Sequence, residues 1–135
     1  MTSGRILVVE DERITAEDLR DILTDLGYAV TAVVSTGPDA IREAERASPD
    51  LVLMDIHIKG DMDGVEAARI IRERFRIPAV YLTAHADQAT LERAKQAEPL
   101  GYIVKPFQEP ELRATIEMAL HKHKIERETG EREQR

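Results

Sequence analysis

The sequence predicts an α/β domain in which five parallel strands form one sheet covered by helices on both faces. Short, nearly continuous apolar runs alternate five times with longer amphipathic stretches along the chain. Strands buried on both faces carry such uninterrupted apolar runs, and helical crossovers between them give a parallel sheet. The crossovers are expected to be right-handed. A length of 135 residues fits one compact domain with a short extension.

The strands are expected where the apolar runs occur, because Val, Ile and Leu dominate them and turn residues bound them. The predicted ranges are Arg5–Val9, Tyr28–Val34, Leu51–Asp55, Ala79–Thr83 and Gly101–Val104. Pro78 introduces the fourth run.

The helices are expected between the strands, where apolar residues recur at helical spacing. The first helix is expected from Arg13 to Leu26, and its apolar residues at that spacing are Ile14, Leu19, Ile22, Leu23 and Leu26. The other four helices are expected from about Pro38 to Ala47, from an Asp63 N-cap through Phe75, from Asp87 to Ala97, and from Glu109 to about Lys124. Residues 125–135 are charged and almost without apolar side chains. The domain is therefore expected to span residues 1–124, with residues 125–135 as a charged tail or a helical linker.

The composition excludes several classes of protein. The chain has no Cys, which rules out disulfides, thiolate chemistry and zinc–cysteine sites. A net charge of −7 argues against direct binding to nucleic acid. No run approaches the roughly 18–20 apolar residues of a membrane-spanning helix, and acidic residues come too early for a secretory signal. We therefore expect a cytoplasmic protein that does not insert into membranes.

Polar residues follow the predicted strands, at the edge where open α/β sheets bind ligands. Glu10 and Asp11 follow the first strand, Asp55 ends the third, Thr83 ends the fourth and Lys105 follows the fifth. Converging carboxylates repel one another unless a cation lies between them, and oxygen ligands suit Mg²⁺. A carboxylate beside Mg²⁺ and a lysine is able to act as a nucleophile toward a phosphoryl group.

Five motifs at these strand ends resemble those of the response regulator receiver domain of two-component signalling. They are "ILVVEDE", "LVLMDI", a following "DG", "YLTA" and "GYIVKPF", in that order, and the resemblance covers roughly residues 4–122. It implies a flavodoxin-like (βα)5 three-layer sandwich with strand order 2-1-3-4-5. It also implies a phosphorylation-dependent switch that receives its phosphoryl group from a sensor histidine kinase or a phosphotransfer protein.

The resemblance assigns roles to residues around the predicted phosphorylation site. Asp55 resembles the phospho-acceptor, and Lys105 resembles the amine that contacts the acyl phosphate. Asp11 resembles a direct Mg²⁺ ligand together with Asp55, whereas Glu10 resembles one that acts through water. The backbone carbonyl of His57 falls where the family supplies a main-chain metal ligand.

Other residues resemble those that transmit or tune the signal. Thr83 and Tyr102 occupy the switch positions, Tyr102 turning inward when the threonine hydroxyl moves toward the phosphoryl group. The Lys105–Pro106 peptide bond is expected to be cis, an isomer accessible before proline. His57 and His85 flank the site two residues after Asp55 and Thr83, and either edge the pocket or tune the lifetime of the phosphoryl group. Ala84 is small and leaves room for a donor.

Partners are implied only in kind. A downstream effector is expected to bind the face formed by the fourth helix, fifth strand and last helix, and the charged outer face of the last helix allows a homodimer. No output domain is expected within these residues, so the chain is either a stand-alone receiver or a fragment of a longer protein.

Three alternative functions remain at this point. A phosphohydrolase with an aspartate nucleophile requires a second acid two residues later, where this chain has His57. A nucleotide-binding module requires a phosphate-cradling loop after the first strand, where "EDE" repels phosphate. A receiver-like scaffold that is never phosphorylated does not need the full set of polar residues. The chain is thus expected not to be a conventional turnover enzyme, although it promotes its own phosphoryl transfer and dephosphorylation.

Overall fold

The computed structural model describes residues 4–58, 60–84, 88–95 and 99–133, with side chains for all of these except residues 88–91 and 127–133. Five strands and five helices alternate along this part of the chain. The strands are β1 (Arg5–Val9), β2 (Ala29–Val34), β3 (Leu51–Asp55), β4 (Ala79–Thr83) and β5 (Gly101–Val104). The helices are α1 (Arg13–Asp25), α2 (Gly37–Ala47), α3 (Gly64–Phe75), α4 (Gln88–Lys95) and α5 (Glu109–Glu133).

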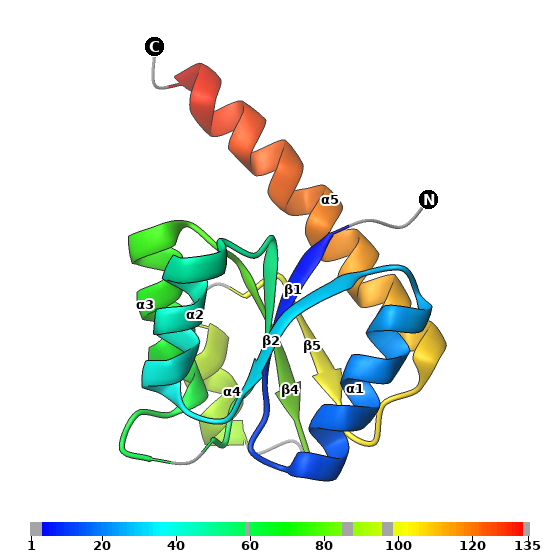
Figure 1. Ribbon diagram of the computed structural model, residues 1–135. Coiled ribbons are helices and arrows are strands. Elements are labelled where there is room, and N and C mark those ends of the chain that lie inside the picture. Colours follow the sequence, from blue (N-terminus) through cyan, green and yellow to red (C-terminus); the bar gives the residue numbers. More distant parts are fainter. Residues whose placement is uncertain (1–3, 59, 85–87, 96–98, 134–135) are drawn as a thin grey trace.

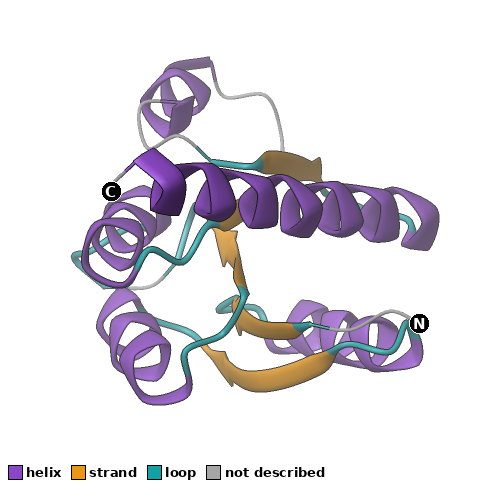
Figure 2. Cartoon of the chain, turned by 90° about the horizontal axis from the view of Figure 1, so that it is seen from above, coloured by secondary structure: helices purple, strands orange, loops and turns teal. Residues whose placement is uncertain are grey.

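The strands form one parallel sheet in the order β2-β1-β3-β4-β5, which confirms the predicted fold. Helices α1 and α5 cover one face, and α2, α3 and α4 cover the other (Figures 1 and 2). The molecule is therefore the three-layer sandwich that alternating strands and helices produce.

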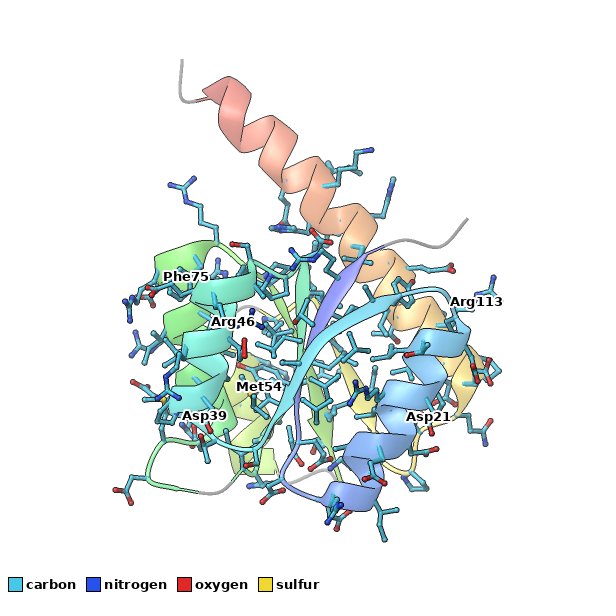
Figure 3. All side chains as sticks on the ribbon, in the orientation of Figure 1. Asp21, Asp39, Arg46, Met54, Phe75 and Arg113 are labelled. Carbon is cyan, nitrogen blue, oxygen red and sulfur yellow. The ribbon has the colours of Figure 1, made fainter. Side chains whose placement is uncertain are left out.

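Each face of the sheet has its own hydrophobic core, because successive strand side chains point to opposite sides. In β1, Ile6 and Val8 pack toward α1 and α5, whereas Leu7 and Val9 pack toward α2 and α3. β3 alternates in the same way, and Figure 3 shows its Met54 in the interior of the molecule. All five residues of β3 and of β4 are buried, so these two central strands form a rigid support for whatever follows them.

Three sequence expectations differ from the structure in detail. β2 begins at Ala29, since the backbone N–H of Tyr28 donates to Leu23 O at 3.0 Å and ties Tyr28 to the end of α1. Ile14 does not share the inner face of α1 and is 83% exposed. It lies five residues before Leu19, about 140° around the helix from it.

The last helix is longer than predicted and continues to Glu133 instead of ending near Lys124. Glu, Arg and Lys are good helix formers even without a core to pack against. The predicted tail of residues 125–135 is thus helical through residue 133, and this part of α5 projects beyond the three layers (Figure 1).

Two capping residues fix the loops beside the carboxyl ends of the strands. Thr36 caps α2 by accepting a hydrogen bond from the Asp39 N–H at 3.3 Å. Asp63 caps α3 by accepting from the Glu66 N–H at 2.9 Å, as predicted. Within the described part of the chain, no helix combines the length and apolarity needed to cross a membrane.

Candidate functional site at the carboxyl edge of the sheet

The strand register brings the predicted site residues to one edge of the sheet. Val9 pairs with Met54, so Glu10 and Asp55 follow side by side at the ends of β1 and β3. Thr83 ends β4 opposite Val104 of β5, and Lys105 is the next residue. The Lys105 N–H donates to Thr83 O at 2.7 Å, which extends the pairing of β4 and β5 by one residue.

Asp55 is only 5% exposed, and both of its carboxylate oxygens accept hydrogen bonds. Oδ1 accepts from the His57 N–H at 2.9 Å, and Oδ2 accepts from Lys105 Nζ at 2.8 Å. The backbone next to it is fixed by the Ile56 N–H, which donates to Leu82 O at 3.1 Å. A buried charge is stable only when it is paired and hydrogen-bonded, and Asp55 meets both conditions.

Lys105 joins the two buried carboxylates. Its Nζ lies 2.8 Å from Asp55 Oδ2 and 2.5 Å from Glu10 Oε1. Burial lowers the pKa of Lys105, but the hydrogen bonds to Asp55 and Glu10 outweigh burial and leave this pKa raised. The ammonium group therefore stays charged between two acidic partners.

Glu10 is the second buried acid of this site. It is 2% exposed, and its Oε2 accepts from the Glu12 N–H at 3.2 Å. Burial, followed by the proximity of Asp55, raises the pKa of Glu10 from 4.5 to about 7, although Lys105 opposes this rise. The ammonium group of Lys105 therefore does not fully offset the cost of burying the Glu10 charge beside Asp55.

Three acids are arranged so that they are able to hold a metal ion. Glu10, Asp11 and Asp55 each offer a carboxylate oxygen, and these oxygens lie within 4.8 Å of one another. Asp11 is half-buried, between the two buried acids and solvent. Hard divalent cations prefer such all-oxygen ligand sets, so the donors present fit a Mg²⁺-type ion.

The structure describes four of the five predicted switch and modulating residues. Thr83 is buried at the end of β4, and the exposed Ala84 follows it. Tyr102 is half-buried on β5, and burial raises its pKa. The His57 side chain is exposed. His85 lies outside the described residues.

The peptide bond between Lys105 and Pro106 is cis. Pro106 itself is exposed at the start of the connection from β5 to α5. This connection carries Lys105 to the acidic cluster.

The sequence analysis overlooked Tyr81. Its side chain is fully buried on β4, and its hydroxyl has no hydrogen-bond partner within the described part of the chain. The rings of Tyr81 and Tyr102, which are paired in the sheet register, lie 6.1 Å apart between centroids at an interplanar angle of 33°. The sequence does mark this residue, because it is the one aromatic side chain within the run "AVYLT" of β4.

The sequence analysis also overlooked two contacts that position the loop after β3. The Gly64 N–H donates to Ile56 O at 3.0 Å, and a Cβ on Gly64 would come within 2.1 Å of Asp55 O. Asp63, besides capping α3, pairs with Arg93 of α4 at 2.7 Å. The start of α3 is thus packed against the strand end that carries Asp55, and it is tied to α4.

A doubly wound five-stranded sheet with acids and a lysine at its carboxyl edge is the arrangement of a receiver domain. The family model for the response regulator receiver domain matches residues 6–117, and the chain belongs to this family. Its members function in two-component signal transduction.

Curated relatives are response regulators. The chain is 37% identical over 116 residues to the transcriptional regulatory protein PdtaR of Mycobacterium tuberculosis, covering 86% of this chain and 56% of PdtaR. It is 35% identical over 119 residues to the DNA-binding response regulator MtrA of Mycobacterium leprae, covering 88% of this chain and 52% of MtrA. The chain spans about half the length of these relatives.

Solved structures agree in fold. The signal receiver domain of a modulated diguanylate cyclase from Desulfovibrio desulfuricans is 40% identical with a TM-score of 0.88, covering 93% of this chain and 99% of that one. The N-terminal domain of a response regulator/sensory box/GGDEF protein from Carboxydothermus hydrogenoformans is 36% identical with a TM-score of 0.83, covering 90% and 98% of the two chains.

Proposed function

We propose that this chain is a phosphorylation-dependent signalling switch in which Asp55 accepts a phosphoryl group from a sensor histidine kinase or a phosphotransfer protein. The proposal rests on the surroundings of the Asp55 carboxylate. It is almost buried, it is anchored by the His57 N–H and Lys105 Nζ, and it belongs to a cluster of three acids. An anchored carboxylate beside a cation is a competent nucleophile.

In the proposed reaction an oxygen of Asp55 attacks phosphorus in line with the donor imidazole. A phosphorus–oxygen bond forms, the phosphorus–nitrogen bond breaks, and the imidazole nitrogen keeps the electron pair. Lys105 already contacts Asp55 Oδ2, so its ammonium group is placed to pair with the incoming phosphoryl oxygens.

We assign the metal site to Asp11, Asp55, the backbone carbonyl of His57 and, through water, Glu10. A Mg²⁺ ion held there supplies the positive charge that offsets the phosphoryl oxygens. The acid cluster supports this assignment, because its three oxygens lie within 4.8 Å of one another.

The proposed output is a change in the face formed by α4, β5 and α5. Phosphorylation draws the Thr83 hydroxyl toward the phosphoryl group, and Tyr102 turns inward to fill the space. The two states are populated in proportion to their free energies, and the phosphoryl group shifts that balance. A downstream effector then binds one state better than the other. We further propose that the exposed His57 side chain, Ala84 and His85 control the access of water and donor to Asp55.

The domain boundary is also a proposal. Residues 1–124 constitute the receiver unit, and residues 125–135 are a charged tail or linker, which continues α5 as far as residue 133. The chain turns over no separate substrate and catalyses only its own phosphorylation and dephosphorylation.

The test is to incubate the protein with acetyl phosphate and Mg²⁺ and to record its intact mass. We expect one phosphoryl adduct that is lost in Asp55→Asn and when a chelator replaces Mg²⁺. Asp61→Asn is the matched control, since it makes the same chemical change at an exposed aspartate in the loop that follows β3. The absence of an adduct in the wild type, or its persistence in Asp55→Asn, would refute the proposal and favour an unswitched scaffold.

A further inference from the structure

The hydroxyl of Tyr81 is enclosed in the core without a hydrogen-bond partner within the described part of the chain. Burial raises the pKa of Tyr81, so the hydroxyl keeps its proton and remains a hydrogen-bond donor. A buried polar group without a partner destabilises a fold, and such groups are rare in native proteins. A phenylalanine would fill almost the same space without this cost. The hydroxyl is therefore unfavourable in the conformation that the structure describes.

Tyr81 lies beside both residues that we assign to the switch. Thr83 follows it by two residues on β4, so both side chains project from the same face of the sheet. Tyr102 is its direct neighbour in the register of β4 and β5, and the two ring centroids lie 6.1 Å apart. Aromatic pairs in proteins lie at about 4.5–7 Å, so these two rings have room to approach each other further.

Tyr102 is better placed to supply the missing partner than the charged groups nearby. Asp63 and Arg93 also act on Tyr81 electrostatically, but they pair with each other at 2.7 Å. The second carboxylate oxygen of Asp63 accepts from the Glu66 N–H and caps α3. A tyrosine hydroxyl both donates and accepts, so the Tyr102 hydroxyl is able to accept from Tyr81 and still donate to a third group.

We propose that Tyr81 is a positioning residue for Tyr102. Its hydroxyl donates a hydrogen bond to the Tyr102 hydroxyl in the conformation that phosphorylation favours, and it lacks this bond in the conformation that the structure describes. This inference rests on the proposed function, in which Tyr102 turns inward. The inward ring supplies a partner for the buried hydroxyl and removes the cost of leaving it unpaired. Tyr81 thus favours the phosphorylated conformation by destabilising the alternative one.

The location of the tyrosine pair connects it to the proposed output face. Tyr102 belongs to β5, and it packs against the core cluster that contains Tyr81 and the fully buried Ala94 of α4. A hydrogen bond between the two hydroxyls would therefore hold Tyr102 where the sheet meets α4. The effector that we expect on the face of α4, β5 and α5 would encounter this fixed arrangement.

The test uses the full chain with Mg²⁺ and beryllofluoride, an anion that takes the place of a phosphoryl group on a carboxylate. Its apparent dissociation constant is measured from the fluorine NMR signals of the free and bound anion. We expect Tyr81→Phe to bind beryllofluoride several-fold more weakly, up to about tenfold, because the variant loses one hydrogen bond of the bound conformation and relieves the alternative. Equal affinities of the wild type and Tyr81→Phe would overturn the proposal.

Tyr28→Phe is the matched control. The Tyr28 hydroxyl is also buried without a partner among the described residues, but it belongs to the core on the opposite face of the sheet. The same chemical change at this position should leave the affinity for beryllofluoride unchanged. An equal loss in Tyr28→Phe and Tyr81→Phe would mean that any buried hydroxyl has this effect, which contradicts a specific role of Tyr81.

A double-mutant cycle identifies the partner of Tyr81. Tyr102→Phe keeps the ring and removes only the hydroxyl, so it should weaken binding as Tyr81→Phe does. Two groups that share one hydrogen bond give non-additive losses, and the double variant should bind about as well as either single variant. Additive losses would show that the two hydroxyls act separately and would rule out the pairing. Failure of the wild type to bind beryllofluoride would count against the proposed function itself, whereas binding without a loss in Tyr81→Phe would count against the role of Tyr81 alone.

Discussion

Replacing Gly64 with alanine should destabilise the domain through the strand end that carries Asp55. A Cβ at this first residue of α3 would lie 2.1 Å from Asp55 O and 2.9 Å from Ile56 Cα. These are backbone atoms of a buried strand, so relief of the clash requires α3 or the end of β3 to move by about 1 Å.

The magnitude follows from two costs. Overpacking of a tightly packed site costs about 1–3 kcal/mol. The same movement weakens the hydrogen bond from the Gly64 N–H to Ile56 O, which is worth roughly 0.5–1.5 kcal/mol. We therefore expect Gly64→Ala to lower the free energy of unfolding by about 2–4 kcal/mol, measured by urea denaturation with the m-value checked.

Gly37→Ala is the matched control, because Gly37 is the first residue of α2 and the added methyl group changes helix propensity in the same way. Its Cβ would meet the Met62 side chain, with Sδ at 2.8 Å, Cγ at 3.0 Å and Cβ at 3.1 Å. The flexible end of this side chain is able to rotate away, and its Cβ needs to shift by only a few tenths of an ångström. We expect a cost below about 1 kcal/mol. If Gly64→Ala is as stable as Gly37→Ala, the close approach of α3 to Asp55 is not rigid and the reasoning fails. Phosphoryl uptake from acetyl phosphate should likewise fall in Gly64→Ala and not in Gly37→Ala.

Three further predictions concern the buried polar groups. Lys105→Met removes the ammonium partner of both Glu10 and Asp55. It should cost roughly 3–5 kcal/mol in chelator, and Mg²⁺ should recover part of the loss. Equal stability with and without Mg²⁺ would argue against the metal site. Because folding raises the pKa of Glu10 from 4.5 to about 7, the folded state binds a proton that the unfolded state has released between these values. Without metal, the stability that Glu10 contributes should be complete below about pH 4.5 and lost as the pH rises through 7. Glu10→Gln should remove this pH dependence of the free energy of unfolding, measured with urea. If the wild type and Glu10→Gln show the same pH dependence, the prediction is wrong. The buried Tyr81 hydroxyl has no hydrogen-bond partner among the described residues. Tyr81→Phe should therefore raise stability by up to about 1 kcal/mol, measured by thermal unfolding. A marked loss of stability would show that the hydroxyl is satisfied.

The sequence predicted the fold well because the strands are buried on both faces and therefore consist of uninterrupted apolar runs. β3 and β4 begin and end at the predicted residues for this reason. The site could be located because parallel strands end at a common edge, which places Asp55 near Lys105 although fifty residues separate them. The features that could not be predicted depend on the path of the chain beyond the strands, on side-chain packing and on helix length outside the core.

The pairing of Lys105 with both Glu10 and Asp55 depends on the path of the chain after β5, for which the sequence contains no periodic signal. Whether any described side chain reaches the Tyr81 hydroxyl depends on the packing of its neighbours, which the sequence does not reveal. The full length of α5 was missed because a charged helix beyond the core has no apolar stripe on its inner side to reveal it. Local propensity, rather than packing, determines where such a helix ends.

The charge balance at the carboxyl edge explains why a buried strand ends in an aspartate. Three carboxylates, those of Glu10, Asp11 and Asp55, share one edge with a single ammonium group, that of Lys105. With all groups ionised, the edge carries two uncompensated negative charges, and the raised pKa of Glu10 is the response of the protein when no further cation is present. A divalent cation held by these acids would supply the missing charge. The buried strands β1 and β3 hold these acids in place, so the acids are unable to relieve their repulsion by moving apart. Their repulsion therefore favours binding of such a cation, and the bound cation would in turn favour binding of a phosphoryl group.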